Sequence, residues 1–275
     1  MPDQSDIEMR LLLDAIYHRY HFDFRAYATP SLKRRLRAAM QRFRCDTLSQ
    51  LQDRALHEPA LFPALLDYLT VHVSEMFRDP SYFRALRETV LPVLRTYPSL
   101  KVWVAGCSAG EEAYSMAILL HEEGLLARSL IYATDINPRA LQRAEAGVFD
   151  VASIAGFTDN HRRSGAPVSL SDYYMAAYDS AVFNKALKKH IVFSDHSLAT
   201  DSVFAEVQLV SCRNVLIYFD RGLQERAIGL FRDSLCHGGF LGIGSKESLR
   251  FSRHADAFAT VSAEDRIYRL QGATA

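Results

Sequence analysis

The sequence lacks the features that mark secreted, membrane-bound and nucleic-acid-binding chains. Its four cysteines form no CxxC pair, which favours reduced thiols in a core over a disulfide framework. Lysine plus arginine and aspartate plus glutamate each number 32, so no net charge attracts nucleic acid or an anionic membrane. The N-terminal stretch MPDQSDIEMRLLLDAIY has only a short apolar run. We therefore expect no signal peptide, no membrane insertion and a cytoplasmic location.

Metal ligands in a usable spacing are also missing. His18, His21 and His72 form no HExxH or comparable set, so the sequence predicts no metal site. A chain of 275 residues can bury a sizeable core without a metal or a disulfide. The absence of a GxGxxG motif argues against dinucleotide oxidoreduction.

The N-terminal part of the chain has the pattern of helices. Between residues 5 and 70, apolar side chains recur at spacings of three and four, with breaks near Pro30 and Pro59. No strand-like alternation interrupts this pattern. We expect a helical domain over residues 1–80, which would dock the substrate, and a second domain over residues 81–275.

The second part alternates short apolar runs with helical stretches, after a connecting helix near residues 81–94. This alternation is typical of a parallel sheet with helices on both faces. The strand-like runs are KVWVAG, LIYATD, KHIVFS, VQLVSC and FLGIGS. A polar tract around residues 150–190 reads as an insertion, and the tail FATVSAEDRIYRLQ offers two further strands that could close the sheet with an antiparallel pair.

A turn of small residues follows the first strand. It runs from Gly106 to Gly110 and leads through Glu111 and Glu112 into a helix. In a doubly wound sheet such turns bind ligands, because glycine lets the backbone approach closely. The two glutamates would repel a phosphate and attract a cation, such as the ammonium or sulfonium of S-adenosylmethionine. The alternative is that they only complement the helix dipole.

An acidic residue stands at the tip of the second strand. Asp135 lies about 25 residues beyond Gly110, close to the spacing at which a carboxylate accepts from ribose hydroxyls. Taken alone, Asp135 could equally cap the helix that starts at Pro138. Combined with the first turn, the ribose role is favoured.

A polar Arg213-Asn214 pair separates two apolar stretches at the end of the fourth run. Burying such groups without partners would cost about 1–3 kcal/mol each. Either Arg213 pairs with an internal carboxylate, or Asn214 and its neighbours line the cofactor pocket while Tyr218 faces the substrate. Both possibilities stay open from the residues alone.

Four motifs in this order resemble the chemotaxis-receptor glutamate O-methyltransferase (CheR) family. They are SEMFRDP, WVAGCSAGEEAYSMA, YATDIN and CRNVLIYFD. The resemblance covers nearly the whole chain, up to the GSKESL segment at residues 244–249. It implies a doubly wound, mostly parallel α/β sheet of the S-adenosylmethionine-dependent methyltransferase type, with a small all-helical N-terminal domain and an inserted small β-subdomain.

The resemblance also implies which residues form the site. With Glu111 added from the first turn, the cofactor pocket would draw on His72, Ser74, Arg78, Glu111, Glu112, Asp135, Ser197, Leu198, Arg213 and Asn214. Arg78 and Tyr218 would lie nearest the transferred methyl group and act in catalysis. The family often has Asn where this chain has His72 and Ser197, and Thr where it has Ser74. Ser74 keeps a hydroxyl, whereas the other two positions lose an amide.

The activity implied is transfer of a methyl group from S-adenosylmethionine to glutamate carboxylates of chemotaxis receptors, in chemotactic adaptation. The product of the cofactor would be S-adenosylhomocysteine. The expected partner is the cytoplasmic domain of a methyl-accepting receptor, with no nucleic acid, and the resemblance implies a monomer. Two other functions stay open: a small-molecule O-methyltransferase, and a cofactor-binding sensor or adaptor without turnover.

A basic helix adds to the case for a protein partner. Lysine and arginine fill six positions between Lys33 and Arg44. Such a run is most often a solvated helix face. In a protein whose substrate is an acidic helical bundle, the same run could dock and steer the partner.

Overall fold

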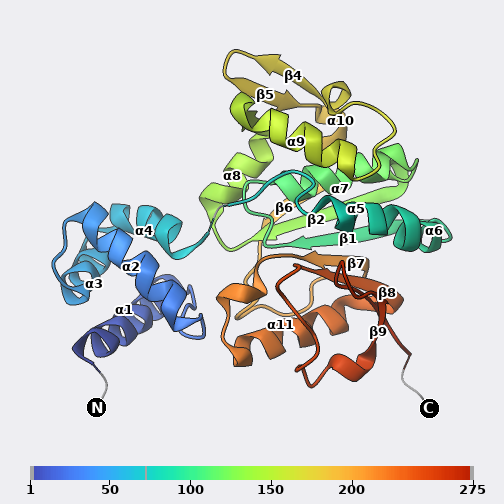
Figure 1. The fold of residues 1–275 in the computed structure, drawn as a ribbon. Coiled ribbons are helices and arrows are strands. Elements are labelled where there is room, and N and C mark those ends of the chain that lie inside the picture. Colours follow the sequence, from blue (N-terminus) through green and yellow to red (C-terminus); the bar gives the residue numbers. More distant parts are fainter. Residues whose placement is uncertain (1–2, 72, 273–275) are drawn as a thin grey trace.

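A helical N-terminal part stands beside an α/β part in the structure, a computed structural model that describes residues 3–71 and 73–272 (Figure 1). The N-terminal elements are α1 (Gln4–Tyr20), α2 (Thr29–Phe43), α3 (Leu48–His57), the 3₁₀ turn η1 (Pro59–Leu61) and α4 (Phe62–Leu69). Thr47 caps α3 by accepting from the amide of Gln50, and Pro30 starts α2 where no amide donor is needed. Leu12, Leu36 and Leu65 are buried in one shared core.

A seven-stranded sheet forms the centre of the α/β part, in the order β6-β2-β1-β7-β8-β10-β9. The strands are β1 (Leu100–Ala105), β2 (Ser129–Asp135), β6 (Ile191–Asp195), β7 (Val207–Cys212), β8 (Leu235–Ile243), β9 (Phe258–Ser262) and β10 (Ile267–Leu270). Strands β6, β2, β1, β7 and β8 pair in parallel, and β10 pairs antiparallel with β8 and β9. The five predicted runs and the closing antiparallel pair are confirmed.

Helices cover both faces of this sheet. They are α5 (Pro80–Ala85), the π-helical η2 (Leu86–Val90), α6 (Leu91–Leu94), α7 (Glu111–Glu122), α8 (Pro138–Ala146) and α11 (Arg221–Ser234), with short 3₁₀ turns η3 (Leu126–Arg128), η5 (Leu216–Tyr218) and η6 (Ala255–Ala257). Along β1, Val102 and Val104 pack in the cluster of α7, while Trp103 packs with α11 residues. Strand residues alternate between faces, so one strand serves both cores.

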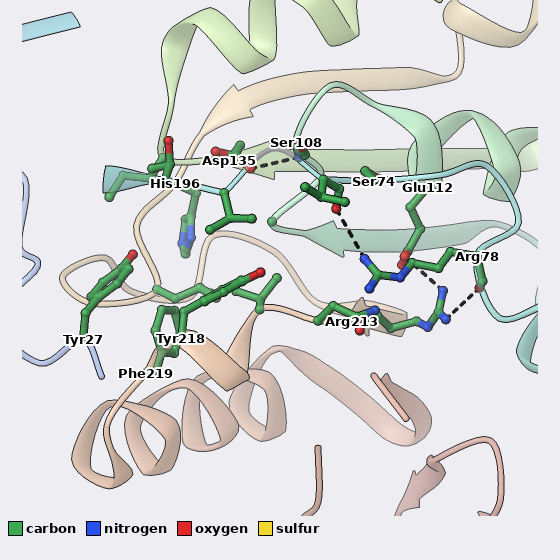
Figure 2. A pocket seen from close by; sticks show the side chains of 18 of the residues that line it. Tyr27, Ser74, Arg78, Ser108, Glu112, Asp135, His196, Arg213, Tyr218 and Phe219 are labelled. Carbon is green, nitrogen blue, oxygen red and sulfur yellow. Dashed lines mark hydrogen bonds and ion pairs between the residues drawn. The ribbon is translucent and has the colours of Figure 1, made fainter. Parts of the chain in front are cut away.

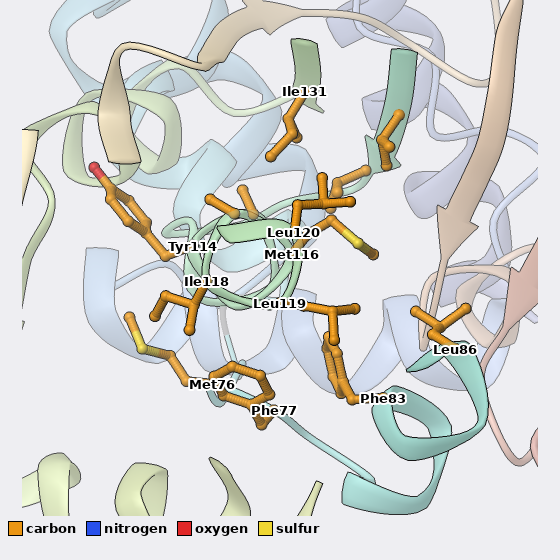
Figure 3. Close-up of a cluster of buried hydrophobic side chains, with 14 of the residues drawn as sticks. Met76, Phe77, Phe83, Leu86, Tyr114, Met116, Ile118, Leu119, Leu120 and Ile131 are labelled. Carbon is orange, nitrogen blue, oxygen red and sulfur yellow. The ribbon is translucent and has the colours of Figure 1, made fainter. Parts of the chain in front are cut away.

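Helix α7 is buried on nearly all sides (Figure 3). Its side chains Met116, Leu119 and Leu120 point in different directions into one apolar cluster, which also holds Phe77 and Phe83. A helix that is apolar all round belongs inside a protein rather than on its surface. The N-terminus of α7 is thereby held rigidly at the turn that follows β1.

The inserted segment forms a small β-subdomain, drawn at the top of Figure 1. It contains β3 (Val148–Asp150), α9 (Val151–Arg163), η4 (Leu170–Tyr173), β4 (Tyr174–Ala177), β5 (Ser180–Phe183) and α10 (Lys185–Lys188), with antiparallel strands in the order β3-β5-β4. The polar tract did not reveal α9. The helix is amphipathic and buries Ile154, Phe157 and His161.

A buried ionic cluster fastens the β-subdomain to α7. The Nε2 atom of His161 lies 2.8 Å from the Oε1 atom of Glu122, and Arg87 pairs with the other oxygen. Burial alone would raise the pKa of the Glu122 carboxyl, but the hydrogen bonds from His161 and Arg87 outweigh it and lower that pKa. The far end of α7 is therefore tied to the insert by charge-assisted bonds.

The cysteines and the hydropathy of the helices bear on two further expectations. All four cysteines are free and buried, as the spacing predicts. Within residues 3–71 and 73–272, none of the helices combines the length and hydropathy that a membrane span needs.

Candidate active site

A pocket lies where the carboxyl ends of the parallel strands meet the N-terminal helical part (Figure 2). In open α/β sheets this edge is where ligands bind. The lining residues come from the helical part, from the loop between α4 and α5, and from the ends of β1, β2, β6 and β7: Tyr27, Arg35, Thr70, Val71, Val73, Ser74, Arg78, Gly106, Ser108, Glu112, Asp135, Ile136, His196, Leu198, Arg213, Asn214, Val215, Tyr218 and Phe219.

The turn after β1 has no room for a side chain at Gly106. Gly106 has φ of 75°, and a Cβ there would lie 2.5 Å from a methyl group of Val215. The amide of Gly106 donates to the carbonyl of Thr134 at 2.8 Å. The amide of Ser108 donates to the Oδ2 atom of Asp135 at 2.9 Å. The turn is therefore joined to the tip of β2, and glycine is required for its close approach.

Asp135 sits at that tip and faces the pocket. Its Oδ1 atom accepts from the amide of Asn137 at 2.9 Å. The cap of α8 is Asn137, whose side chain accepts from the amides of Arg139 and Ala140. The capping alternative for Asp135 is therefore wrong, and its carboxylate is held in place by backbone donors at the pocket wall.

Arg213 is fully buried and links two carboxylates. Its Nη1 atom lies 3.1 Å from Oε2 of Glu112, and its Nη2 atom lies 2.8 Å from Oδ2 of Asp79. Nη2 also donates to the carbonyl of Arg78 at 2.8 Å. The pairing of Arg213 with internal carboxylates is confirmed, and Arg213 also lines the pocket. The roles of Asn214 toward the cofactor and of Tyr218 toward the substrate stay predictions. Glu112 is more than a helix-dipole partner, since it is half of this ion pair.

Tyr82 and Ser211 form a hydrogen-bonded chain that ends on the carboxylate of Glu112. The hydroxyls of Tyr82 and Ser211 lie 2.8 Å apart, and the hydroxyl of Ser211 donates to Oε1 of Glu112 at 2.6 Å. Burial raises the pKa of Tyr82, so the phenol stays protonated. The guanidinium of Arg213 lies 4.2 Å from the centre of the Tyr82 ring. Nothing in the local sequence marks Tyr82 for this role.

Glu247 organises the loop that carries Asn214 and Tyr218. Its carboxylate accepts from the amides of Gly244 at 2.6 Å, Asn214 at 3.1 Å and Ile217 at 3.2 Å. Burial raises the pKa of Glu247, and these backbone donors oppose that rise. Asn214 has φ of 59°, a left-handed conformation that such bonds stabilise. Glu247 belongs to the GSKESL segment, but the sequence of that segment does not reveal that Glu247 binds these backbone amides.

Arg35 reaches the pocket from the opposite wall. It is 8% exposed, and its guanidinium donates to the carbonyls of Leu69 and Ser31. Its Nη2 atom is buried and has no hydrogen-bond partner among the described residues. The guanidinium lies 5.4 Å from the centre of the Tyr218 ring, and burial lowers the pKa of Arg35.

The prediction placed Arg35 with the other cations of the basic run. Helical spacing contains the missing signal, because Leu32, Leu36 and Ala39 are buried on α2 and Arg35 lies within their stripe. Neighbouring Arg34 is exposed. One cation of the run therefore faces inward, where the sequence suggested a uniform surface.

The structure brings together most of the predicted site residues. Those that line the pocket are Ser74, Arg78, Glu112, Asp135, Leu198, Arg213, Asn214 and Tyr218. Glu111 and Ser197 do not line it. Glu111 is buried under the loop before α5, where Ser74 bonds its carboxyl, and burial raises the pKa of that carboxyl. The hydroxyl of Ser197 accepts from the amide of Ala199 at 3.3 Å. The prediction for His72 lies outside the described residues.

The pocket has the polar groups that a nucleoside linked to an amino acid would need. Five buried polar atoms on its lining residues have no hydrogen-bond partner in the described part of the chain: Ser108 Oγ, Asn214 Nδ2, Arg35 Nη2, Arg213 Nε and His196 Nδ1. Buried polar atoms of this kind are costly unless a ligand satisfies them. S-adenosylmethionine fits this set, since Asp135 can accept from its ribose and Glu112 can attract its cationic end.

A doubly wound sheet with this pocket defines the class of S-adenosylmethionine-dependent methyltransferases. Comparison with known families agrees: residues 72–267 match the model "CheR methyltransferase, SAM binding domain", and residues 7–70 match "CheR methyltransferase, all-alpha domain". The chain belongs to the CheR methyltransferase family.

Individual relatives extend over most of the chain. It is 56% identical over 265 residues to "Putative methyltransferase Cher3" of Pseudomonas putida, covering 96% of this chain and 97% of that protein. It is 31% identical over 229 residues to "Chemotaxis protein methyltransferase" of Listeria innocua, covering 82% of this chain and 84% of that protein. A solved N-methyltransferase, NodS of Bradyrhizobium japonicum, aligns at 16% identity with a TM-score of 0.41, covering 72% of this chain and 90% of that chain.

Proposed function

We propose that this methyltransferase esterifies glutamate side-chain carboxylates of chemotaxis receptors. The observation that carries the proposal is Arg35, a buried cation that lines the pocket near Tyr218 and has one nitrogen without a hydrogen-bond partner among the described residues. A buried guanidinium in this state favours an anionic group as its ligand. The Listeria relative, whose name specifies chemotaxis, supports a receptor as the protein that carries this carboxylate.

The sheet wall of the pocket would hold the cofactor. Asp135 would accept from the ribose, while Glu112, Asn214 and Ser74 would surround the amino-acid end. When bound, S-adenosylmethionine supplies an electrophilic methyl group on a positively charged sulfur. Arg213 pairs with Glu112, so it keeps that carboxylate oriented before any ligand arrives.

The reaction needs no general base. A glutamate with a reference pKa of about 4.3 is already a carboxylate at neutral pH. Charge disappears as an anionic nucleophile meets a cationic methyl donor, so water that stabilises both ions slows the transfer. The buried ring of Phe219 and the half-buried rings of Tyr27 and Tyr218 line the pocket and reduce its access to water. We assign the rate enhancement mainly to alignment and exclusion of water.

Two arginines would share the orientation of the substrate carboxylate. Tight pairing with both carboxylate oxygens would stabilise the ground state and slow the reaction. Within the described part of the chain, a single buried nitrogen of Arg35 lacks a partner, so it can hold one oxygen and leave the other to attack. Arg78 is half-buried, and its Nη1 atom donates to the carbonyl of Val73 at 3.3 Å. It lies on the opposite side of the pocket, where we assign it to positioning near the reacting methyl group.

The helical part would also dock the receptor. Arg34, Arg37, Arg42 and Arg44 are exposed on or just after α2, the helix that carries Arg35 into the pocket. An acidic, glutamate-bearing helical bundle matches this charge, which would steer the encounter and align the substrate.

The test is to incubate the protein with methyl-labelled S-adenosylmethionine and a cytoplasmic receptor fragment. We expect label in the fragment and its release as methanol in mild alkali, which identifies a carboxyl methyl ester. The matched control is the same fragment with glutamine in place of its candidate glutamates, which should stay unlabelled.

Two outcomes would contradict the proposal. If S-adenosylhomocysteine binds in calorimetry but no receptor fragment is labelled, the protein is a sensor or adaptor without turnover. If label enters only small carboxylic acids, it is a small-molecule O-methyltransferase.

A further inference from the structure

His196, directly after β6, has one ring nitrogen bonded and the other unsatisfied. Its Nε2 atom lies 3.1 Å from the carbonyl oxygen of Ser202. A carbonyl only accepts, so Nε2 carries the proton, and Nδ1 of the neutral ring is left with a lone pair. Nδ1 is buried and has no hydrogen-bond partner among the described residues. The histidine therefore presents an acceptor that a ligand with an N–H group could satisfy.

The backbone places His196 next to the ribose-binding position. Strands β2 and β6 pair in parallel with Asp135 opposite Asp195, so Ile136 and His196 follow side by side. The amide of His196 donates to the carbonyl of Asp135 at 3.3 Å. His196 and Ile136 both line the pocket, and Figure 2 shows the imidazole between Asp135 and Phe219.

The order of the strands decides which part of the cofactor lies there. Glu112 lies in the helix after β1, Arg213 directly follows β7, and Asp135 is the last residue of β2. The amino-acid end of the cofactor is placed at β1 and β7, and the ribose at β2. The base must then extend toward β6, which is the next strand beyond β2 in the sheet. His196 and Leu198 are the lining residues that follow β6.

The imidazole is also held in orientation by aromatic rings. Trp103 and Phe204 each lie 5.2 Å from its centre. These contacts alone would make His196 a packing residue. They do not explain why a polar ring with an unsatisfied nitrogen stands at this position, where an apolar side chain would pack without that cost.

We propose that His196 recognises the adenine of the cofactor by accepting a hydrogen bond at Nδ1 from its 6-amino group. A base with oxygen at carbon 6 would present an acceptor to the same lone pair and would be disfavoured. The neighbouring Ser197 has no side-chain amide and does not line the pocket, so His196 supplies the polar base contact in this chain. This inference rests on the cofactor placement given under the proposed function.

The experiment compares two ligands by calorimetry: S-adenosylhomocysteine and its 6-oxo analogue S-inosylhomocysteine. The variants are His196→Leu and His196→Asn, which match in shape but differ in that asparagine keeps an acceptor near the position of Nδ1. We expect the wild type to prefer the amino ligand. The ratio of the dissociation constant of S-inosylhomocysteine to that of S-adenosylhomocysteine should fall by roughly thirtyfold in His196→Leu and by much less in His196→Asn.

Phe204→Leu is the packing control. It changes the support of the imidazole without removing a polar atom, so we expect the affinities for both ligands to shift together with little change in their ratio. An unchanged ratio in His196→Leu would overturn the inference, even if both ligands bind less tightly. Failure of wild-type protein to bind S-adenosylhomocysteine would instead overturn the cofactor placement. Thermal unfolding without ligand checks that each variant is folded.

Discussion

The pocket has two walls, one formed by the strand ends and one by the N-terminal helices, and each contains a buried arginine in a different electrostatic environment. On the sheet wall, Arg213 meets Glu112 and Asp79, and its charge is compensated before any ligand binds. On the helical wall, the guanidinium of Arg35 donates to backbone carbonyls and lies near the Tyr218 ring, with no carboxylate partner among the described residues. The first arrangement is a prebuilt support, and the second is an unbalanced charge that favours an incoming anion. The comparison assigns cofactor binding to the sheet wall and recognition of the carboxylate to the helical wall.

Removing Arg213 should have the largest effect, because it leaves Glu112 and Asp79 without their common partner. Breaking a buried ion pair costs about 3–5 kcal/mol, and the partial exposure of Asp79 puts Arg213→Ala toward the lower end. We expect a drop of about 3 kcal/mol in the free energy of unfolding, measured in urea, and a loss of S-adenosylhomocysteine binding in calorimetry. Arg250→Ala, an exposed arginine, should change neither quantity. If cofactor affinity survives Arg213→Ala, the sheet wall is not the prebuilt support.

Removing Arg35 should separate substrate from cofactor. Arg35→Met keeps the apolar stem and deletes an uncompensated buried charge, so we expect unfolding stability to stay level or rise. Transfer of label to the receptor fragment should fall by roughly a hundredfold in kcat/KM, as expected for loss of one charge-assisted hydrogen bond. Affinity for S-adenosylhomocysteine should stay close to the wild-type value. Exposed Arg34 provides the control Arg34→Met, which should weaken only the salt-dependent part of receptor binding. Equal losses in Arg35→Met and Arg34→Met would remove the distinction between the inner and outer cations.

Changing Glu247 should give a smaller effect with a characteristic pH dependence. Glu247→Gln replaces one acceptor oxygen by an amide that faces backbone donors, and we expect a loss of about 1–2 kcal/mol in unfolding stability. The pKa of Glu247 is raised above 4.5 by burial, so the folded protein binds this proton more tightly than the unfolded chain. The stability that protonation contributes is complete below pH 4.5 and is lost as pH rises through the folded pKa. The advantage of wild type over Glu247→Gln should therefore shrink with rising pH in urea unfolding, and a growing advantage would contradict the assignment.

The strands, helices and turns could be predicted from the sequence more fully than the partners of the polar and charged side chains at the site. Apolar runs such as KVWVAG mark strands that are buried on both faces, and the Gly106 turn follows from local chemistry. Helix α9 was missed because its polar residues outnumber the three that it buries. The roles of Tyr82 and Glu247 depend on contacts between segments more than 30 residues apart, which no local pattern encodes. Arg35 is the intermediate case, since its helical stripe was readable but its charge favoured a surface position.

Helix α7 also acts as a spacer. It begins at the pocket, ends at the ionic cluster of the β-subdomain, and its 12 residues measure about 18 Å along the axis. Because its surroundings are close-packed, it cannot tilt or shorten without opening the core. The helix therefore fixes the distance between the β-subdomain and the pocket. A partner bound to the β-subdomain would present to the pocket only those side chains that lie at that distance from the bound segment.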